Sequence, residues 1–151
     1  MAQTTDAFSS VNAAIEYATD GGTTWNDIAG ETSKVAPSGG TRQTNVKYTF
    51  DGDTAVITSG KREPLQIAIT ILDTNSSSGV IDDLVTYYES GSNVRFRWAP
   101  AGGATGDYRY TTASTCIIKD PPYPGADAED STPTNLEINL ETPSLTRAAI
   151  S

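Results

Sequence analysis

The sequence contains no histidine, a single cysteine and no long apolar run. Because histidine is the most common general base and the most common metal ligand, its absence excludes Ser-His-Asp and Cys-His catalysis and most zinc sites. The lone Cys116 cannot form a disulfide within the chain, and we interpret it as a small buried residue in a strand. The longest apolar stretches are a handful of residues, far below the roughly 20 needed to cross a bilayer, so we expect no membrane-spanning segment.

Positive charge is also scarce. The 151 residues carry 10 Lys plus Arg against 19 Asp plus Glu, which gives a formal charge of −9. Affinity for phosphates depends on clustered cations that release counterions, so this balance argues against nucleic acid as a bound ligand. It does not argue against a role in which the protein must keep DNA from binding. Met1–Ser10 has neither a cation nor an apolar core, so we expect no secretion signal and a chain that is made and used in a cytoplasm.

The residues that are abundant favour strands joined by turns. The chain has 22 Thr, 14 Ser, 13 Gly and 8 Pro, a composition typical of β proteins. We expect a mainly β fold in which two antiparallel sheets form a sandwich or barrel. The length fits one domain over residues 1–151, with a polar N-terminal arm at 1–10 and a C-terminal tail at 144–151.

Alternation of apolar and polar residues predicts where the strands lie. The clearest case is 65–71, where Leu and Ile point one way while Gln, Ala and Thr point the other. A polar stretch at 30–43 has no period, and we expect it to be a long exposed loop. Weaker alternation predicts further strands at 11–17, 25–28, 46–50, 55–58, 94–98, 108–118 and 136–140.

The period changes to helical spacing once. Five apolar residues then fall on one face: Val80, Ile81, Leu84, Val85 and Tyr88. We expect one helix over 79–90, with Ser78 or Gly79 as its N-cap. Asp82 and Asp83 would sit in the first turn, where the helix dipole favours anions, so we interpret them as dipole partners and not as a catalytic pair.

The remaining motifs point to no enzyme, cofactor or metal. Gly60–Lys61 is not a phosphate loop, because Arg62 stands where Ser or Thr must hold magnesium. Asp127, Glu129 and Asp130 have the ligand type that calcium prefers but lack the spaced loop signature, and we expect a solvated acidic loop. Nothing selects a pair of carboxylates for glycoside hydrolysis. The chain has the profile of a binding module or an assembly subunit.

The order of elements resembles that of the tail tube proteins of long-tailed bacteriophages. The resemblance runs from about Val11 to Pro143 and rests on the segments VNAAIEYATDGGTTWNDIAG, GGTRQTNVKYTFDGDTAVITSGKREPLQIAITIL, VIDDLVTYYESG, VRFRWAPAGG and TNLEINLETP. It implies a β-sandwich or barrel with one flanking helix, which assembles as hexameric rings stacked into a hollow tube.

The same resemblance implies the function and the partners. The tube would be a passive conduit for double-stranded DNA from capsid to host cell, located in the virion tail and assembled in the host cytoplasm. The partners would be other copies of the chain and further tail proteins, namely the tip or initiator, the tape measure and the terminator. The DNA would pass without specific binding, and no membrane would be bound.

Family members carry a long loop or hairpin that reaches the adjacent ring and the neighbouring subunit. The matching stretch here runs from Thr41 to Lys61, and it is polar in all but a few positions. The residues that the resemblance assigns to inter-subunit contact are Thr41, Arg42, Gln43, Thr44, Asn45, Asp51, Gly52, Asp53 and Lys61.

Acidic residues that face the bore would keep DNA centred and mobile, whereas cations would grip its phosphates. Glu137 and Glu141 are the first candidates, because they share the face opposite the apolar residues of the last predicted strand. Asp51 and Asp53, near the predicted hairpin turn, are the second choice. An outer, solvated face is the alternative position for either pair.

A different class of protein stays open as an alternative. An immunoglobulin-like or carbohydrate-binding sandwich, displayed on a virion or a secreted scaffold, could use aromatic residues as a sugar-stacking platform. Most of the aromatics concerned fall at inward positions of alternating strands, so we favour core roles for them. They are Trp25, Tyr48, Trp98, Tyr108 and Tyr110.

Overall fold

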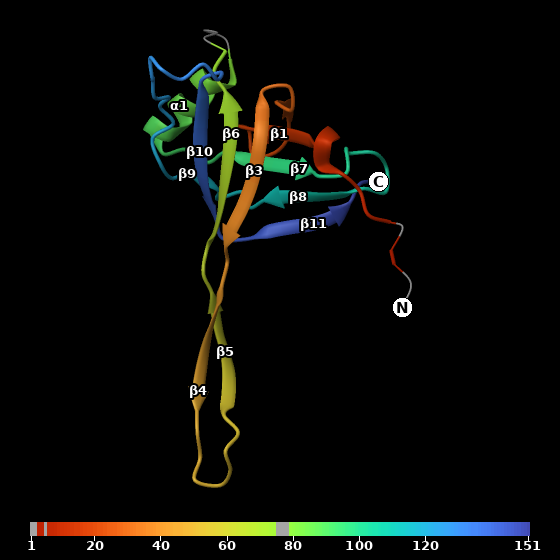
Figure 1. Cartoon of the computed structure of the whole chain (residues 1–151), viewed down its shortest axis with the longest axis vertical. Helices are drawn as coiled ribbons and strands as arrows, with labels where there is room; N and C mark the ends of the chain where they lie inside the picture. The colour runs from red at the N-terminus through yellow and green to blue at the C-terminus, as the bar shows by residue number, and fades with distance from the viewer. Residues whose placement is uncertain (1–2, 5, 75–78) are drawn as a thin grey trace.

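The computed structural model describes residues 3–4, 6–74 and 79–151, and it shows two packed antiparallel sheets with a long hairpin that extends away from them (Figure 1). The first sheet has the order β11-β8-β7-β1-β2, and the second has the order β3-β6-β10-β9. Neither sheet closes on itself, so the expected sandwich is confirmed and a barrel within one subunit is not formed.

The strands of the first sheet are β1 (Ala14–Ala18), β2 (Asn26–Asp27), β7 (Arg95–Ala99), β8 (Tyr108–Thr112) and β11 (Leu145–Ala149). Those of the second are β3 (Thr32–Gly39), β6 (Leu65–Leu72), β9 (Ile117–Ile118) and β10 (Asn135–Thr142). The hairpin consists of β4 (Arg42–Lys47) and β5 (Val56–Arg62), and a short 3-10 turn, η1 (Ser10–Asn12), precedes β1.

The core lies between the inward faces of the two sheets. On β6 and β10 every second residue is buried, and Ile69 lies opposite Ile138 in the register. Phe96 and Trp98 supply the matching inward face of β7. Two buried threonines are hydrogen-bonded to the backbone within this core. The Thr112 hydroxyl accepts from the Phe96 N–H, and the Thr142 hydroxyl accepts from the Ala113 N–H.

The predicted helix is confirmed as α1 (Val80–Ser90). Leu84 is fully buried in the core, and Gly91 ends the helix in the left-handed conformation with φ +68°. Gly79 is the N-cap, and Ser78 lies outside the described residues. The Tyr17 hydroxyl donates to Asp83 at 2.8 Å and so joins α1 to β1. In the described part of the chain, no helix has the length and apolar character needed to cross a membrane.

The expected loop at 30–43 is wrong, because most of it forms β3 and β4. β3 is the outer strand of its sheet and pairs only with β6, with Val35 opposite Ile69 and Pro37 opposite Ile67. An edge strand tolerates Pro because one side of its backbone needs no ladder partner, and it buries few side chains. For both reasons this strand shows no clear apolar period.

Both chain ends also differ from expectation. The segment expected as a C-terminal tail contains β11, which pairs with β8 through Arg147 opposite Tyr110. The guanidinium of Arg147 lies 3.5 Å from the centre of the Tyr108 ring and donates to the Tyr110 hydroxyl. At the other end, the strand expected from Val11 begins only at Ala14, after the 3-10 turn.

Cys116 provides a test of the core. Its side chain is fully buried, as expected, although the residue lies just before β9 and not within a strand as predicted, and burial raises the pKa of the thiol to about 11. We expect a thiol-alkylating reagent at pH 8 to leave the native protein unmodified and to react once denaturant unfolds it. Mass spectrometry across a denaturant titration measures this, and rapid modification without denaturant would contradict the burial of this residue.

Candidate assembly surface

The hairpin is the most exposed part of the described chain. β4 continues from β3 and β5 leads into β6, so the hairpin lengthens these two strands beyond the sandwich (Figure 1). Every residue of β4 and β5 is exposed. Because an isolated two-stranded hairpin is at best marginally stable in water, a segment of this shape indicates a surface that another molecule completes.

Two glycines set the junction between sandwich and hairpin. Gly39 and Gly40 have φ of +73° and +71°, a region that other residues rarely adopt. A Cβ on Gly40 would lie 2.8 Å from a side-chain atom of Leu65. The Gly40 N–H donates to the Pro64 carbonyl at 3.1 Å, and the Glu63 N–H donates to the Thr41 carbonyl at 2.9 Å. These two hydrogen bonds keep the two strands of the hairpin paired at its junction with the sandwich.

One face of the hairpin is apolar near its far end. Val46 lies directly opposite Ile57, so both side chains share a face, and they are 49% and 67% exposed. Tyr48 and Phe50 follow in the connection at 48–55 and are also exposed. In contrast, the Asn45–Thr58 pair on the opposite face is polar. The apolar face is therefore solvated in a single copy and free for contact.

The structure brings the predicted inter-subunit residues into one hairpin. Arg42, Gln43, Thr44 and Asn45 lie in β4, Lys61 lies in β5, Thr41 precedes β4, and Asp51, Gly52 and Asp53 lie in the far connection. That connection spans residues 48–55 and is wider than the turn expected at Asp51–Gly52. The prediction omitted Val56 and Ile57 from this set, and the register of the hairpin places them opposite Lys47 and Val46. Their contact with another subunit stays a prediction.

Glu137 and Glu141 lie on the face of the second sheet that points away from the core. They pair with Thr70 and Gln66 of β6, while the apolar residues of β10 are buried on the other face. Glu137 is exposed and Glu141 is half-buried. The same face carries Lys34, which lies opposite Thr70 from the other side. This outward face is thus mostly polar, with the exposed Ile117 of β9 opposite Glu141, and its place along a bore stays a prediction.

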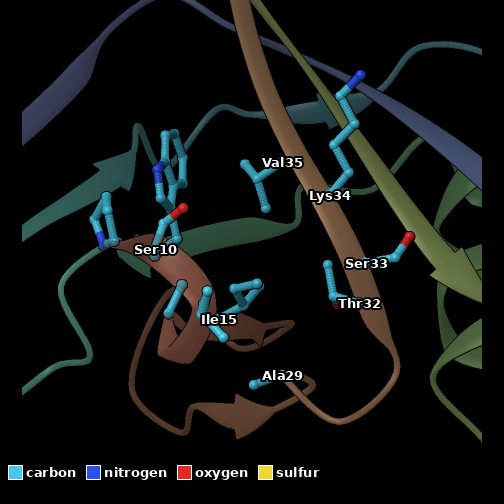
Figure 2. Close-up of a pocket in the computed structure, with 11 residues that line it drawn as sticks. Ser10, Ile15, Ala29, Thr32, Ser33, Lys34 and Val35 are labelled. Carbon is cyan, nitrogen blue, oxygen red and sulfur yellow. The ribbon is translucent and has the colours of Figure 1, made fainter. Parts of the chain in front are cut away.

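A cavity of about 480 Å³ opens between η1, β1 and β3 (Figure 2). Ile15 and Val35 point into it from opposite sides, and Lys34 extends along β3 beside it. Lys34 is the one ionisable residue of the lining, so the cavity offers no acid and base that could act together. The lining residues are Ser10, Val11, Ala13, Ile15, Ala29, Thr32, Ser33, Lys34, Val35, Trp98 and Pro100.

The aromatic residues of the alternative prediction do not form one platform. Trp98 is buried and stacks on Tyr110 at 5.6 Å between ring centres. Trp25 lies under Arg97, whose guanidinium is 4.2 Å from the ring centre and whose Nε donates to Glu16 at 2.6 Å. An inward position is wrong for Tyr48, which is 71% exposed on the hairpin, and for Tyr108, which is 46% exposed. Trp98 and Tyr110 therefore pack on each other, whereas Tyr48 lies apart from them on the hairpin.

The acidic loop is held by local turns. The Asp127 carboxylate accepts the N–H of Glu129, and Asp130 accepts both the N–H and the hydroxyl of Thr132. The hydrogen bond from the Thr132 side chain lowers the pKa of Asp130. Among the described residues, no group of three ligand-type side chains is placed to hold a metal ion.

Comparison with known proteins identifies a class of fold. No family model and no curated protein sequence matches the chain. Solved structures match over nearly its whole length. A chain of the anti-feeding prophage baseplate matches with a TM-score of 0.69 and 11% identity, covering 100% of this chain and 99% of that one. A chain of the tail of a gene transfer agent particle with C6 symmetry has a TM-score of 0.65 and 9% identity, with coverages of 99% and 100%, and the SPP1 tail tube has a TM-score of 0.65 and 10% identity, with coverages of 93% and 78%. The chain thus has the fold of phage-like tail and injection-system components. The tail tube is among the structures that share it.

The apolar face of the hairpin gives a direct test of self-association. We expect Val46→Ser with Ile57→Ser to leave the free energy of unfolding unchanged within about 0.5 kcal/mol, because both side chains are exposed. The same change should abolish association of concentrated protein, measured by sedimentation velocity. Asn45→Ser with Thr58→Ser, on the opposite face, is the matched control. Equal loss in both double variants would mean that the apolar face has no special role.

Proposed function

We propose that this protein is the structural subunit of a phage-type tail tube, which assembles as stacked hexameric rings and conducts double-stranded DNA from capsid to host cell. One observation carries the proposal: over nearly its whole length the chain shares its fold with tail components, a tail tube among them. It also has a hairpin whose two strands are exposed at every residue in a single copy. The role is structural and requires no catalysis, cofactor or metal.

The second sheet supplies a way to close the ring. Its order leaves β3 and β9 as outer strands, each with one unpaired backbone edge within the subunit. Joined edge to edge with a neighbour at either side, six copies of this four-stranded sheet would form a barrel of 24 strands. With strands about 4.8 Å apart and a tilt of about 40°, such a barrel measures about 50 Å between opposite backbones, a bore wide enough for a duplex after side chains are added.

The charge of this wall would determine how DNA moves through it. In this arrangement the outward face of the second sheet, with Glu137 and Glu141, lines the bore. A duplex carries about one negative charge per 1.7 Å, so carboxylates repel it and keep it from adhering to the wall. Six copies at −9 carry −54 per ring, and a Debye length of about 8 Å confines the effect to acids that face the bore.

Other tail proteins complete the proposed assembly. A tip or initiator would start the tube, a tape measure would occupy the bore during assembly, and a terminator would end it. A chain of the tube-terminating cap of the anti-feeding prophage shares the fold (TM-score 0.66, 10% identity, covering 99% of this chain and 95% of that one). The site of action would be the virion tail, assembled in the host cytoplasm, without a membrane partner.

Electron microscopy tests the proposal. Negatively stained preparations of the concentrated full chain should show rings or tubes. Dispersed monomers at every concentration, with or without a tail-tip preparation, would overturn the tube assignment. Binding on a glycan array by such monomers would support the sandwich module instead.

The proposed position of Glu137 and Glu141 in the bore can be tested through the rate of genome ejection. We expect Glu137→Lys with Glu141→Lys to leave tubes intact but to slow genome ejection from assembled particles, because each added cation can pair with a phosphate. Glu137→Gln with Glu141→Gln is the control, since it removes charge without adding a phosphate ligand and should slow ejection less. Ejection rates that equal those of the unmodified particle would place these residues outside the bore.

A further inference from the structure

Charge is segregated along the long axis of the subunit. The strands of the hairpin, β4 and β5, hold four of the ten cations of the chain and none of its acids, and the connection at the far end holds Asp51 and Asp53. The opposite pattern occurs in α1 and in the segment 120–134 between β9 and β10, which together hold seven of the nineteen acids and no Lys or Arg. Figure 1 shows the hairpin at one end of the molecule and both acidic segments at the other.

The acidic segments form one surface. Tyr123 from the 120–134 segment packs edge-on against Tyr88 of α1, with 6.3 Å between ring centres, and its hydroxyl donates to Glu89. These contacts keep the loop beside the helix. We call this surface the acidic end; its charged residues are Asp82, Asp83, Glu89, Asp120, Asp127, Glu129 and Asp130.

The cations of the hairpin are arranged unfavourably for a free subunit. Arg42 lies directly opposite Arg62 across the β4–β5 ladder, and like charges at directly opposed positions destabilise a strand pair. The guanidinium of Arg42 donates to the Gly60 carbonyl. Within the described chain, the one ion pair is Arg97–Glu16, so neither arginine has a carboxylate partner. Arg42 alternates with Val46 onto one face of β4, and Arg62 remains opposite Arg42 after the register shift between Arg42 and Thr44. This makes one strip that is cationic near the sandwich and apolar toward the tip.

We propose that this cationic strip of the hairpin docks on the acidic end of the next copy along the tube, so that subunits join head to tail through complementary charge. The inference rests on the proposed tube function and specifies its axial contact. The two surfaces lie at opposite ends of one molecule, so the contact is heterologous and does not close, which generates a filament. A carboxylate such as that of Glu129 between or beside the two arginines relieves their repulsion, and the apolar part of the strip is buried at the same contact.

A charge exchange tests this contact. Arg62→Glu gives the cationic strip an acid, and Glu129→Lys gives the acidic end a cation, both at exposed positions whose side chains have no hydrogen bond among the described residues. Each variant alone sets like charges against each other at every axial contact, so we expect the concentration needed for tube formation to rise at least about tenfold. An equal mixture restores both kinds of contact in alternation, and tubes should form again near the concentration that the unmodified chain requires.

Lys47→Glu is the matched control, because it makes the same kind of charge change on the same strand pair but on the opposite face of the hairpin, beside Val56. Light scattering and negative-stain microscopy measure assembly, and circular dichroism with an unfolding midpoint checks that each variant is folded. Recovery in the mixture and near-normal assembly of the control support the contact. If Arg62→Glu and Lys47→Glu act alike, or if the mixture fails to recover, the contact is wrong while the tube function stands. If the unmodified chain never assembles, the tube function itself fails.

Discussion

The antiparallel pairing of β6 with both β3 and β10 is the constraint on which the rest of the structure depends. The β6–β10 register runs without interruption from Leu72–Asn135 to Leu65–Thr142. Because successive residues of a strand face opposite sides, this register places the isoleucines of β6 in the core and Gln66 and Thr70 on the outward face. A slip of one residue would reverse both faces at once, so the core and the polar outer wall are fixed by the same interaction.

The same pairing fixes the position of the hairpin. β3 and β6 are neighbours in the second sheet, and the chain passes from β3 to β6 through β4 and β5. The hairpin therefore extends from the edge side of a rigid sheet, and its direction is set at Gly39 and Gly40. The sandwich has a complete core of its own, whereas the hairpin is exposed on both faces and carries opposed arginines. The subunit thus combines a sandwich with its own core and a hairpin whose strands bury no side chain within the subunit.

Much of the fold followed from local pattern, and the exceptions share a physical cause. The strand at 65–71, the strand at 136–140 and the helix at 79–90 were predicted because each buries one whole face and so shows a clear period. β3 and β11 were missed because both are outer strands: β3 buries few side chains, and β11 has one half-buried and four exposed residues. The hairpin strands were partly predicted, but the apolar pairing of Val46 with Ile57 depends on the register across the turn.

The sequence by itself determined the β-rich composition, the absence of histidine chemistry, the excess of acids and the strands with a buried face, since each of these is a property of residue types or of neighbours in the chain. Only the tertiary structure decided that Glu137 and Glu141 share an outward wall with Lys34 of a distant strand, that Arg42 lies opposite Arg62, and that the basic hairpin and the acidic end lie at opposite ends of the molecule. The reason is physical. Alternation sets which residues share a face of one strand, but strand order and register, which depend on long-range packing, set which strands bring their faces together.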